Sequence, residues 1–150
     1  MSSTSSTSNM RVTKRNGELE EVSFDKILNR IKTIGEEVNI AINYQQLAIK
    51  VIDQLIDGMA TSKIDELTAE QCIAMSTQHT HYGTLASRII ISNHHKNTDA
   101  DFGAVVNALY DNVNVHGQHK PIVNAAFHAF VNHHAATLNS YLDYSRDYTL

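Results

Sequence analysis

The sequence predicts a mainly α-helical fold, a helical bundle capped by a small β-hairpin or short sheet, and three observations support this. Asn16-Gly17 is a strong hairpin signal, because a type I′ turn needs two consecutive residues that tolerate positive φ. Beyond residue 24, apolar residues recur at the spacing of amphipathic helices. Proline occurs once and glycine six times, so few residues interrupt those helices.

The hairpin places Lys14 and Arg15 at the mouth of its turn. The pattern then changes from strand to helix at Phe24, and Asp25 is the expected N-cap of the first helix. The apolar stripe of this helix comprises Phe24, Ile27, Leu28, Ile31 and Ile34.

Two further helices follow. One is expected from Tyr44 to Leu55, ended by Gly58 as a C′ glycine. The next is expected over residues 63–78, with Ser62 as its N-cap paired with Asp65. Cys72 is predicted to pack on the apolar face of that helix as a small hydrophobe.

A fourth helix, over residues 82–97, is apolar over more than half its circumference, which is typical of a helix in the middle of a bundle. The polar run at residues 98–101 is the best candidate for a boundary between two domains. A fifth helix begins at Phe102, Pro121 opens a sixth, and a last helical segment covers residues 135–143.

Composition excludes several classes of function. A net charge of −4 argues against a general nucleic-acid or membrane-surface binder, so any cationic site must be local. The single Cys72 excludes an internal disulfide and fits a reducing compartment, the cytoplasm. No apolar run approaches the ~20 residues that a membrane-spanning helix needs. Residues 1–9 are rich in Ser, Thr and Asn, so they are expected to form a disordered tail and not a secretory signal.

Three cations are candidates for binding phosphate: Lys14, Arg15 and Lys96. Taken singly, each is more typical of solvated surface. Lys14 and Arg15 are adjacent, and adjacent strand residues point to opposite faces. No glycine-rich phosphate loop is present, so a nucleotide site must be built from side chains of the hairpin and a neighbouring helix.

The nine histidines raise the possibility of a metal site. Their clusters lack the His-x-x-x-His spacing with Glu of a zincin helix, and they have no cysteine partners. Most are therefore expected to be surface histidines, and no metal ligands are assigned.

A family resemblance strengthens the nucleotide hypothesis. Residues 12–27 read V-x-K-R-x-G-x-x-E-x-V-x-F-D-K-I, which resembles the opening of the ATP-cone, the nucleotide-sensing module at the N-terminus of ribonucleotide reductase large subunits. Residues 58–70 resemble the G-x-x-T-x-x-(L/I)-D-x-L-x-A-E segment of these subunits, and residues 82–96 resemble their Y-x-x-L-A-A-R-I-x-x-S-N-L-H-K segment. Residues 138–148 are similar to their L-N-S and Y-D-R-D-F elements. The four blocks occur in order and with compatible spacing.

The resemblance implies a set of nucleotide-binding residues. The phosphates would be held by Lys14, Arg15 and Lys96, and the sugar, where ATP and dATP differ, would lie near Thr61 and Asp65. The remaining implied residues, several of them bordering the adenine, are Glu20, Val22, Ser23, Lys26, Ile27, Leu55 and Asn93. The chain departs from the family pattern at Asn16, His94 and Ser145, where the family has Asp, an apolar residue and Asp.

The resemblance also implies an organisation and a role. Residues 10–98 would be the ATP-cone, and residues 99–150 would begin the helical region of a class I ribonucleotide reductase large subunit. ATP with Mg²⁺ would favour deoxyribonucleotide synthesis and dATP would suppress it. The chain would itself hold no catalytic residues, since one cysteine cannot supply the dithiol that ribose reduction requires. Implied partners are the rest of the large subunit, the radical-generating small subunit and further copies in a homo-oligomer, with no nucleic acid and no membrane.

Two alternatives stay open. The chain could be a free-standing nucleotide-sensing module without catalysis, although the zinc-ribbon repressors that carry an ATP-cone need cysteines that it lacks. It could also be a helical bundle whose nucleotide site has decayed. A downstream reading frame that encodes a barrel with paired cysteines would separate these alternatives from the reductase.

Overall fold

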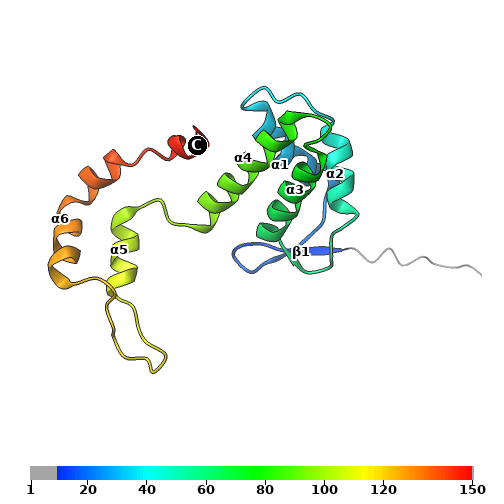
Figure 1. Cartoon of the computed structure of the whole chain (residues 1–150). Coiled ribbons are helices and arrows are strands. Elements are labelled where there is room, and N and C mark those ends of the chain that lie inside the picture. The colour runs from blue at the N-terminus through cyan, green and yellow to red at the C-terminus, as the bar shows by residue number, and fades with distance from the viewer. Residues whose placement is uncertain (1–9, 150) are drawn as a thin grey trace, which may run out of the picture. The chain divides into compact units, whose positions relative to one another are not determined.

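The computed structural model describes residues 10–149, and the tail predicted for residues 1–9 lies outside them. Helices dominate, and a three-stranded sheet accompanies them, so the predicted fold class is confirmed (Figure 1). The chain divides into two compact units, one ending at His94 and the other beginning at His95. The boundary expected between residues 98 and 99 stays a prediction.

The sheet combines the hairpin with a strand from later in the chain. Strands β1 (Arg11–Thr13) and β2 (Leu19–Glu21) pair antiparallel, with Val12 opposite Glu20. Strand β3 (Met59–Ala60) pairs parallel on the other side of β1, with Val12 opposite Met59. The strand order β2-β1-β3 thus places the hairpin directly beside the segment that leads into the third helix.

The hairpin turn differs from the predicted type I′ turn. Gly17 has φ +86°, but Asn16 does not have a positive φ, so the type I′ prediction is wrong. The Lys14 N–H donates to the Glu18 carbonyl at 2.8 Å and the Gly17 N–H donates to the Lys14 carbonyl at 3.0 Å. This is a three-residue loop, in which a tight turn is followed by a left-handed glycine. Arg15 therefore sits within the loop and not at the end of a strand.

Helix α1 (Phe24–Glu36) is capped by Ser23, whose hydroxyl accepts from the Lys26 N–H at 3.4 Å. The predicted Asp25 cap is wrong, since Asp25 lies inside the first turn. Ile31 and Ile34 are buried as the stripe predicts, while Phe24 at the helix start is exposed.

Helix α2 covers Tyr44–Ile52, and its C-cap is Asp53, several residues before Gly58. Gly58 does have a positive φ of +81°, but it serves the sheet and not the helix, so its assignment as a helix cap is wrong. Its N–H donates to the Arg11 carbonyl at 2.8 Å, and its own carbonyl accepts from the Thr13 hydroxyl at 2.9 Å.

Helix α3 (Thr61–Met75) begins directly after β3, and helix α4 covers Thr80–Asn97. The predicted Ser62 cap is wrong, because the N-cap position is Ala60, which makes no side-chain capping bond. Asp65 is consequently not a capping partner and is buried in the first part of α3.

One core joins the sheet to the first four helices. Leu47, Val51, Cys72 and Leu85 have no exposed surface, which confirms the packing predicted for Cys72. Helix α4 buries one face and leaves Ile90 44% exposed, so it does not have the largely buried circumference that its sequence predicted. Figure 1 shows the sheet at one end of this group of helices, where α3 begins.

The second unit contains α5 (Phe102–Tyr110), α6 (Ala125–Tyr141) and a 3₁₀ helix, η1 (Tyr144–Thr149). The prediction that Pro121 opens the sixth helix is wrong, because the N-cap of α6 is Asn124. The separate helical segment expected over residues 135–143 lies mostly within α6. Asp147 of η1 lies 2.7 Å from His95 Nε2, which joins two of the sequence blocks that resemble the reductase. No helix among residues 10–149 is both long and apolar enough to cross a membrane.

Candidate functional site

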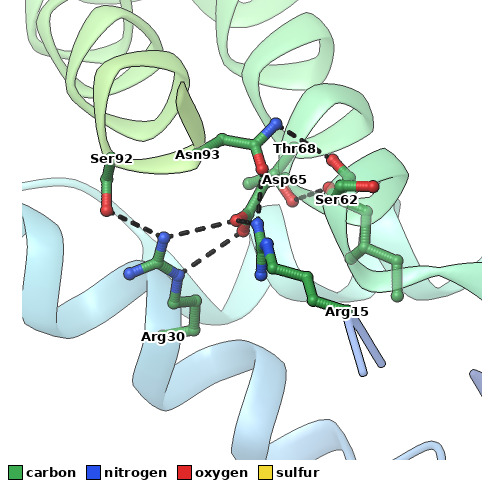
Figure 2. A network of polar contacts seen from close by, with 8 residues as sticks. Arg15, Arg30, Ser62, Asp65, Thr68, Ser92 and Asn93 are labelled. Atoms are coloured by element: carbon green, nitrogen blue, oxygen red, sulfur yellow. Dashed lines mark hydrogen bonds and ion pairs between the residues drawn. The ribbon is translucent and has the colours of Figure 1, made fainter. Parts of the chain in front are cut away.

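A buried carboxylate, Asp65, lies at the centre of a polar network in the first unit (Figure 2). The residue is 7% exposed and projects from the first part of α3. Arg15 of the hairpin loop donates to Asp65 Oδ2 at 3.4 Å, and Arg30 of α1 donates to the same oxygen at 3.3 Å. Segments far apart in the sequence therefore meet at one acidic side chain.

The two arginines approach Asp65 differently. Arg30 Nε also donates to Asp65 Oδ1 at 3.5 Å, so this guanidinium engages both carboxylate oxygens. Arg30 Nη2 donates in addition to the Ser92 hydroxyl of α4 at 2.9 Å. Figure 2 shows Arg30 between Asp65 and Ser92, with Arg15 on the other side of the carboxylate.

Asn93 of α4 is the second buried member of the network, with 5% of its surface exposed. Its Oδ1 accepts from Arg15 Nη2 at 2.5 Å, and its Nδ2 donates to the Ser62 carbonyl at 3.2 Å. Because the amide accepts from one segment and donates to another, it fixes the hairpin loop and the first turn of α3 against α4.

Electrostatics explain why two cations surround one acid. A carboxylate withdrawn from water must be compensated by charge and hydrogen bonds, and removing its partners leaves a costly buried charge. The Arg15 and Arg30 side chains are 30% and 28% exposed, so both also reach solvent. The buried carboxylate of Asp65 thus holds the guanidinium groups of Arg15 and Arg30 near the surface.

A second charged cluster lies on the strands of the hairpin and at the start of α1. Glu20 accepts from Lys14 Nζ at 3.0 Å through one oxygen and pairs with Lys26 through the other. Lys14 also lies 3.5 Å from Glu18. The pKa of Glu18 is lowered by its hydrogen bond from Asn16 and by the charge of Lys14.

Lys14 and Arg15 therefore serve different clusters, although they are adjacent in the sequence. Lys14 joins Glu20 and Lys26, whereas Arg15 joins Asp65 and Asn93. The structure brings together six of the predicted nucleotide-binding residues in these two clusters.

The other predicted residues of the first unit have varied surroundings. Ser23 caps α1, Val22 donates its N–H to the Met10 carbonyl at 2.9 Å, and Ile27 is partly buried against the core. Leu55 belongs to the core, with 7% of its surface exposed. Thr61 is the first residue of α3.

Lys96 lies in the last turn of α4, exposed and three residues after Asn93. It belongs to the part of the chain that follows the boundary between the units. The nucleotide-binding role of all these residues stays a prediction.

Sequence reasoning missed Arg30 and Ser92. One signal pointed to Arg30: it lies three residues after Ile27 and four before Ile34, so a cation borders the apolar stripe of α1. A charged side chain in that position needs a buried partner. Ser92 carried no comparable signal, since a serine on a helix is usually a surface residue.

Metal-binding and thiol chemistry have little support in the described residues. Residues 10–149 hold no group of three or more His, Cys, Asp or Glu side chains arranged to bind a metal ion. Burial raises the pKa of the Cys72 thiol to about 12, so this cysteine stays protonated at neutral pH.

Comparison with known proteins shows the family of the chain. Residues 10–97 match the family model of the ATP cone domain. The ribonucleoside-diphosphate reductase large subunit of Caenorhabditis elegans is 39% identical over 140 residues, which are 92% of this chain and 18% of that protein. The large subunit of Variola virus is 40% identical over 142 residues, 93% of this chain and 18% of the relative.

The large chain 2 of the Saccharomyces cerevisiae reductase is 39% identical over 142 residues, 93% of this chain and 16% of the relative. The chain spans less than a fifth of the length of these relatives. The resemblance drawn from the sequence blocks is confirmed. The chain belongs to the ATP cone domain family, whose model matches its residues 10–97.

Proposed function

We propose that this chain is the adenine-nucleotide sensor of a ribonucleoside-diphosphate reductase large subunit, in which ATP favours activity and dATP suppresses it. The observation that carries the proposal is a pair of charged clusters that join the hairpin to α1 inside an ATP cone domain. In one cluster Lys14 and Lys26 share Glu20, and in the other Arg15 and Arg30 share Asp65. The match to reductase large subunits over more than nine-tenths of the chain supports that context and disfavours a free-standing sensor.

The phosphates would be bound by Lys14, Arg15 and Lys96. Arg15 is suited to this role, because a guanidinium offers a planar set of donors that matches phosphate oxygens and it lies in a loop at the surface. Lys96 lies on the turn of α4 that follows Asn93, and residues three apart on a helix are neighbours.

The adenine would be bordered by the stretch from Glu20 to Ile27. Val22 and Ile27 are partly buried and apolar, and such side chains can cover the face of a base. Glu20 and Lys26 supply an acceptor and donors beside them. Leu55, the remaining apolar residue of the proposed set, is buried in the core.

The sugar would be read by Thr61 and Asp65 at the start of α3. ATP and dATP differ by one 2′-hydroxyl, and a polar group placed to bond that hydroxyl discriminates against the analogue that lacks it. Asp65 is a carboxylate held in place by two arginines, so its position is well defined.

Mg²⁺ would enter with the nucleotide. The carboxylates of the two clusters, Asp65 and Glu20, are each already paired with two cations, so they are poorly suited to ligate a metal ion. Magnesium characteristically keeps several waters and binds substrate phosphates. The residues present therefore fit a metal carried by the triphosphate and not a dedicated protein site.

Regulation would act by allosteric coupling to a distant active site in the same large subunit. The proposed partners are the remainder of that subunit, the small subunit that generates the radical, and further copies in a homo-oligomer. A reducing compartment, the cytoplasm, suits the free thiol of Cys72. We expect no reductase turnover from this chain alone.

Titration calorimetry with Mg²⁺ tests the proposal directly. ATP and dATP should bind the 150-residue chain, and Arg15→Gln should weaken both by about tenfold to a hundredfold, because it removes charged hydrogen bonds to phosphate. Lys32→Gln is the matched control, since Lys32 is an exposed lysine of α1 paired only with Glu36 in the described ion pairs. Failure of the unsubstituted chain to bind either nucleotide would contradict the proposal.

A further inference from the structure

We infer that Arg30 is a positioning residue that holds Asp65 in place and keeps its charge compensated, so that Arg15 can leave Asp65 for a nucleotide phosphate. This inference rests on the proposed function and extends it to a residue outside the predicted site. Arg30 itself need not touch the nucleotide.

The two arginines contact Asp65 with different geometry. Arg30 uses two nitrogens against both carboxylate oxygens, Nε to Oδ1 at 3.5 Å and Nη2 to Oδ2 at 3.3 Å. Arg15 uses one nitrogen against one oxygen, at 3.4 Å. A two-point pair between arginine and a carboxylate is stronger and more directional than a single contact. The contact of Arg15 with Asp65 is therefore the weaker of the two.

The two arginines also differ in how they are anchored. Arg30 stands in the middle of α1, and its guanidinium is also bonded to the Ser92 hydroxyl at 2.9 Å, so helix and hydroxyl both restrain it (Figure 2). Arg15 belongs to a three-residue hairpin loop, and its other described acceptor, Asn93, is neutral. A phosphate, which is charged, can compete with a neutral amide for a guanidinium.

Departure of Arg15 would leave Asp65 with Arg30 as its described cation. Asp65 is 7% exposed, and a buried carboxylate without a counter-ion is strongly destabilising. With Arg30 in place, Asp65 keeps both oxygens engaged after Arg15 has turned away. Without Arg30, Arg15 is the remaining described cation on Asp65, and moving it would leave the carboxylate unpaired.

Thermal unfolding without nucleotide tests the holding role. Two double-mutant cycles compare Arg30→Gln with Asp65→Asn and Arg15→Gln with Asp65→Asn. We expect the melting-temperature shifts to be less additive in the Arg30–Asp65 cycle, because that pair shares two contacts. An equal or larger departure from additivity in the Arg15–Asp65 cycle would overturn the inference.

Affinity for Mg²⁺-ATP tests the release of Arg15. Arg30→Gln should weaken binding by about tenfold where Asp65 is present, since Asp65 then retains Arg15. The same substitution should cost little in the Asp65→Asn background, where no carboxylate competes for Arg15. Lys32→Gln, on the same helix, controls for the loss of a positive charge.

Three results of the affinity measurements would count against the inference. An equal loss in both backgrounds would show that Arg30 binds the nucleotide itself, and unchanged affinity in Arg30→Gln would show that Arg15 needs no such help. Either result would overturn the inference while leaving the proposed function standing. Absence of nucleotide binding by the unsubstituted chain would overturn the proposed function and the inference with it.

Discussion

Arg15 in the hairpin loop and Asn93 on α4 are joined by a 2.5 Å hydrogen bond, although 78 residues separate them in the sequence. The same Asn93 amide donates to the Ser62 carbonyl, so one buried side chain ties the hairpin, α3 and α4 together. This amide is both a structural link and the neutral partner of a candidate phosphate ligand.

Asn93→Ala should destabilise the first unit by about 1–3 kcal/mol, because the Ser62 carbonyl and Arg15 each lose a described partner in a buried place. Urea unfolding followed by circular dichroism measures the change. Asn29→Ala, an exposed position on α1, is the control and should change stability by less than about 0.5 kcal/mol. Equal stabilities of the two variants would contradict the linking role of Asn93.

Gly35→Ala should destabilise the chain by about 1–3 kcal/mol, because a Cβ at Gly35 would clash with the phenol of Tyr44. That hydroxyl donates to the Ile40 carbonyl, so it cannot move away without losing a bond. The control is Gly83→Ala in α4, where a Cβ meets no atom within 4 Å and should be neutral or stabilising. Thermal unfolding of both variants decides the matter, and equal midpoints would refute the clash.

Lys96→Ala should weaken binding of Mg²⁺-ATP by about tenfold to a hundredfold, the cost of one charged hydrogen bond. Calorimetry at matched salt measures it, because salt screens exposed charges. Lys50→Ala, another exposed lysine in the last turn of its helix, is the control and should bind as the unsubstituted chain does. If Lys96→Ala also binds normally, Lys96 is not a phosphate ligand.

Asp65→Asn should change the ratio of ATP to dATP affinity, because the carboxylate is the group proposed to sense the 2′-hydroxyl. The substitution preserves shape but removes the charge that two arginines face, so the melting temperature should also fall. Calorimetry with both nucleotides gives the ratio. Arg30→Gln disturbs the same ion pair but retains the carboxylate group, so a larger change of the ratio in Asp65→Asn than in Arg30→Gln would assign the effect to the carboxylate itself. A ratio unchanged in Asp65→Asn would retire Asp65 as the discriminator and direct attention to Thr61.

Cys72 should make stability depend on pH in the alkaline range. Its pKa is raised from an ordinary value of 9.0 to about 12 by burial. Between these values the unfolded chain loses the thiol proton and the folded chain keeps it, so stability falls as pH rises above 9. Cys72→Ala should reduce this slope, measured as the difference in melting temperature between pH 8 and pH 10. Identical slopes in the two proteins would contradict burial of the thiol.

Much of the fold could be predicted because it depends on local patterns. The stripe of α1 buries Ile31 and Ile34, and Cys72 packs in the core, both as apolar spacing indicates. Helix ends were less predictable, since several residues near a boundary can each cap it. Ser23 caps α1 in place of Asp25, and α3 begins after Ala60 without a side-chain cap.

The candidate site could be predicted only in part. Lys14, Glu20 and Lys26 are close in sequence, and the short distance along the hairpin brings them together. The pairing of Arg30 with Asp65 spans 35 residues and two helices, so no local pattern could reveal it. Gly58 shows the same limit, because its positive φ fits a helix end as well as the strand entry that it actually serves.

By itself, the sequence determined the mainly helical class, the hairpin position and membership of a nucleotide-binding family. These follow from local sequence features, namely apolar periodicity, turn glycines and motif blocks in a fixed order. Only the tertiary structure decided which cation meets which acid. That choice depends on the parallel pairing of β1 with β3, which sets the hairpin beside the start of α3, and on the burial of Asp65, whose charge is compensated by the neighbouring arginines. Charge compensation in a buried place is a property of three-dimensional neighbours, and the order of residues does not specify those neighbours.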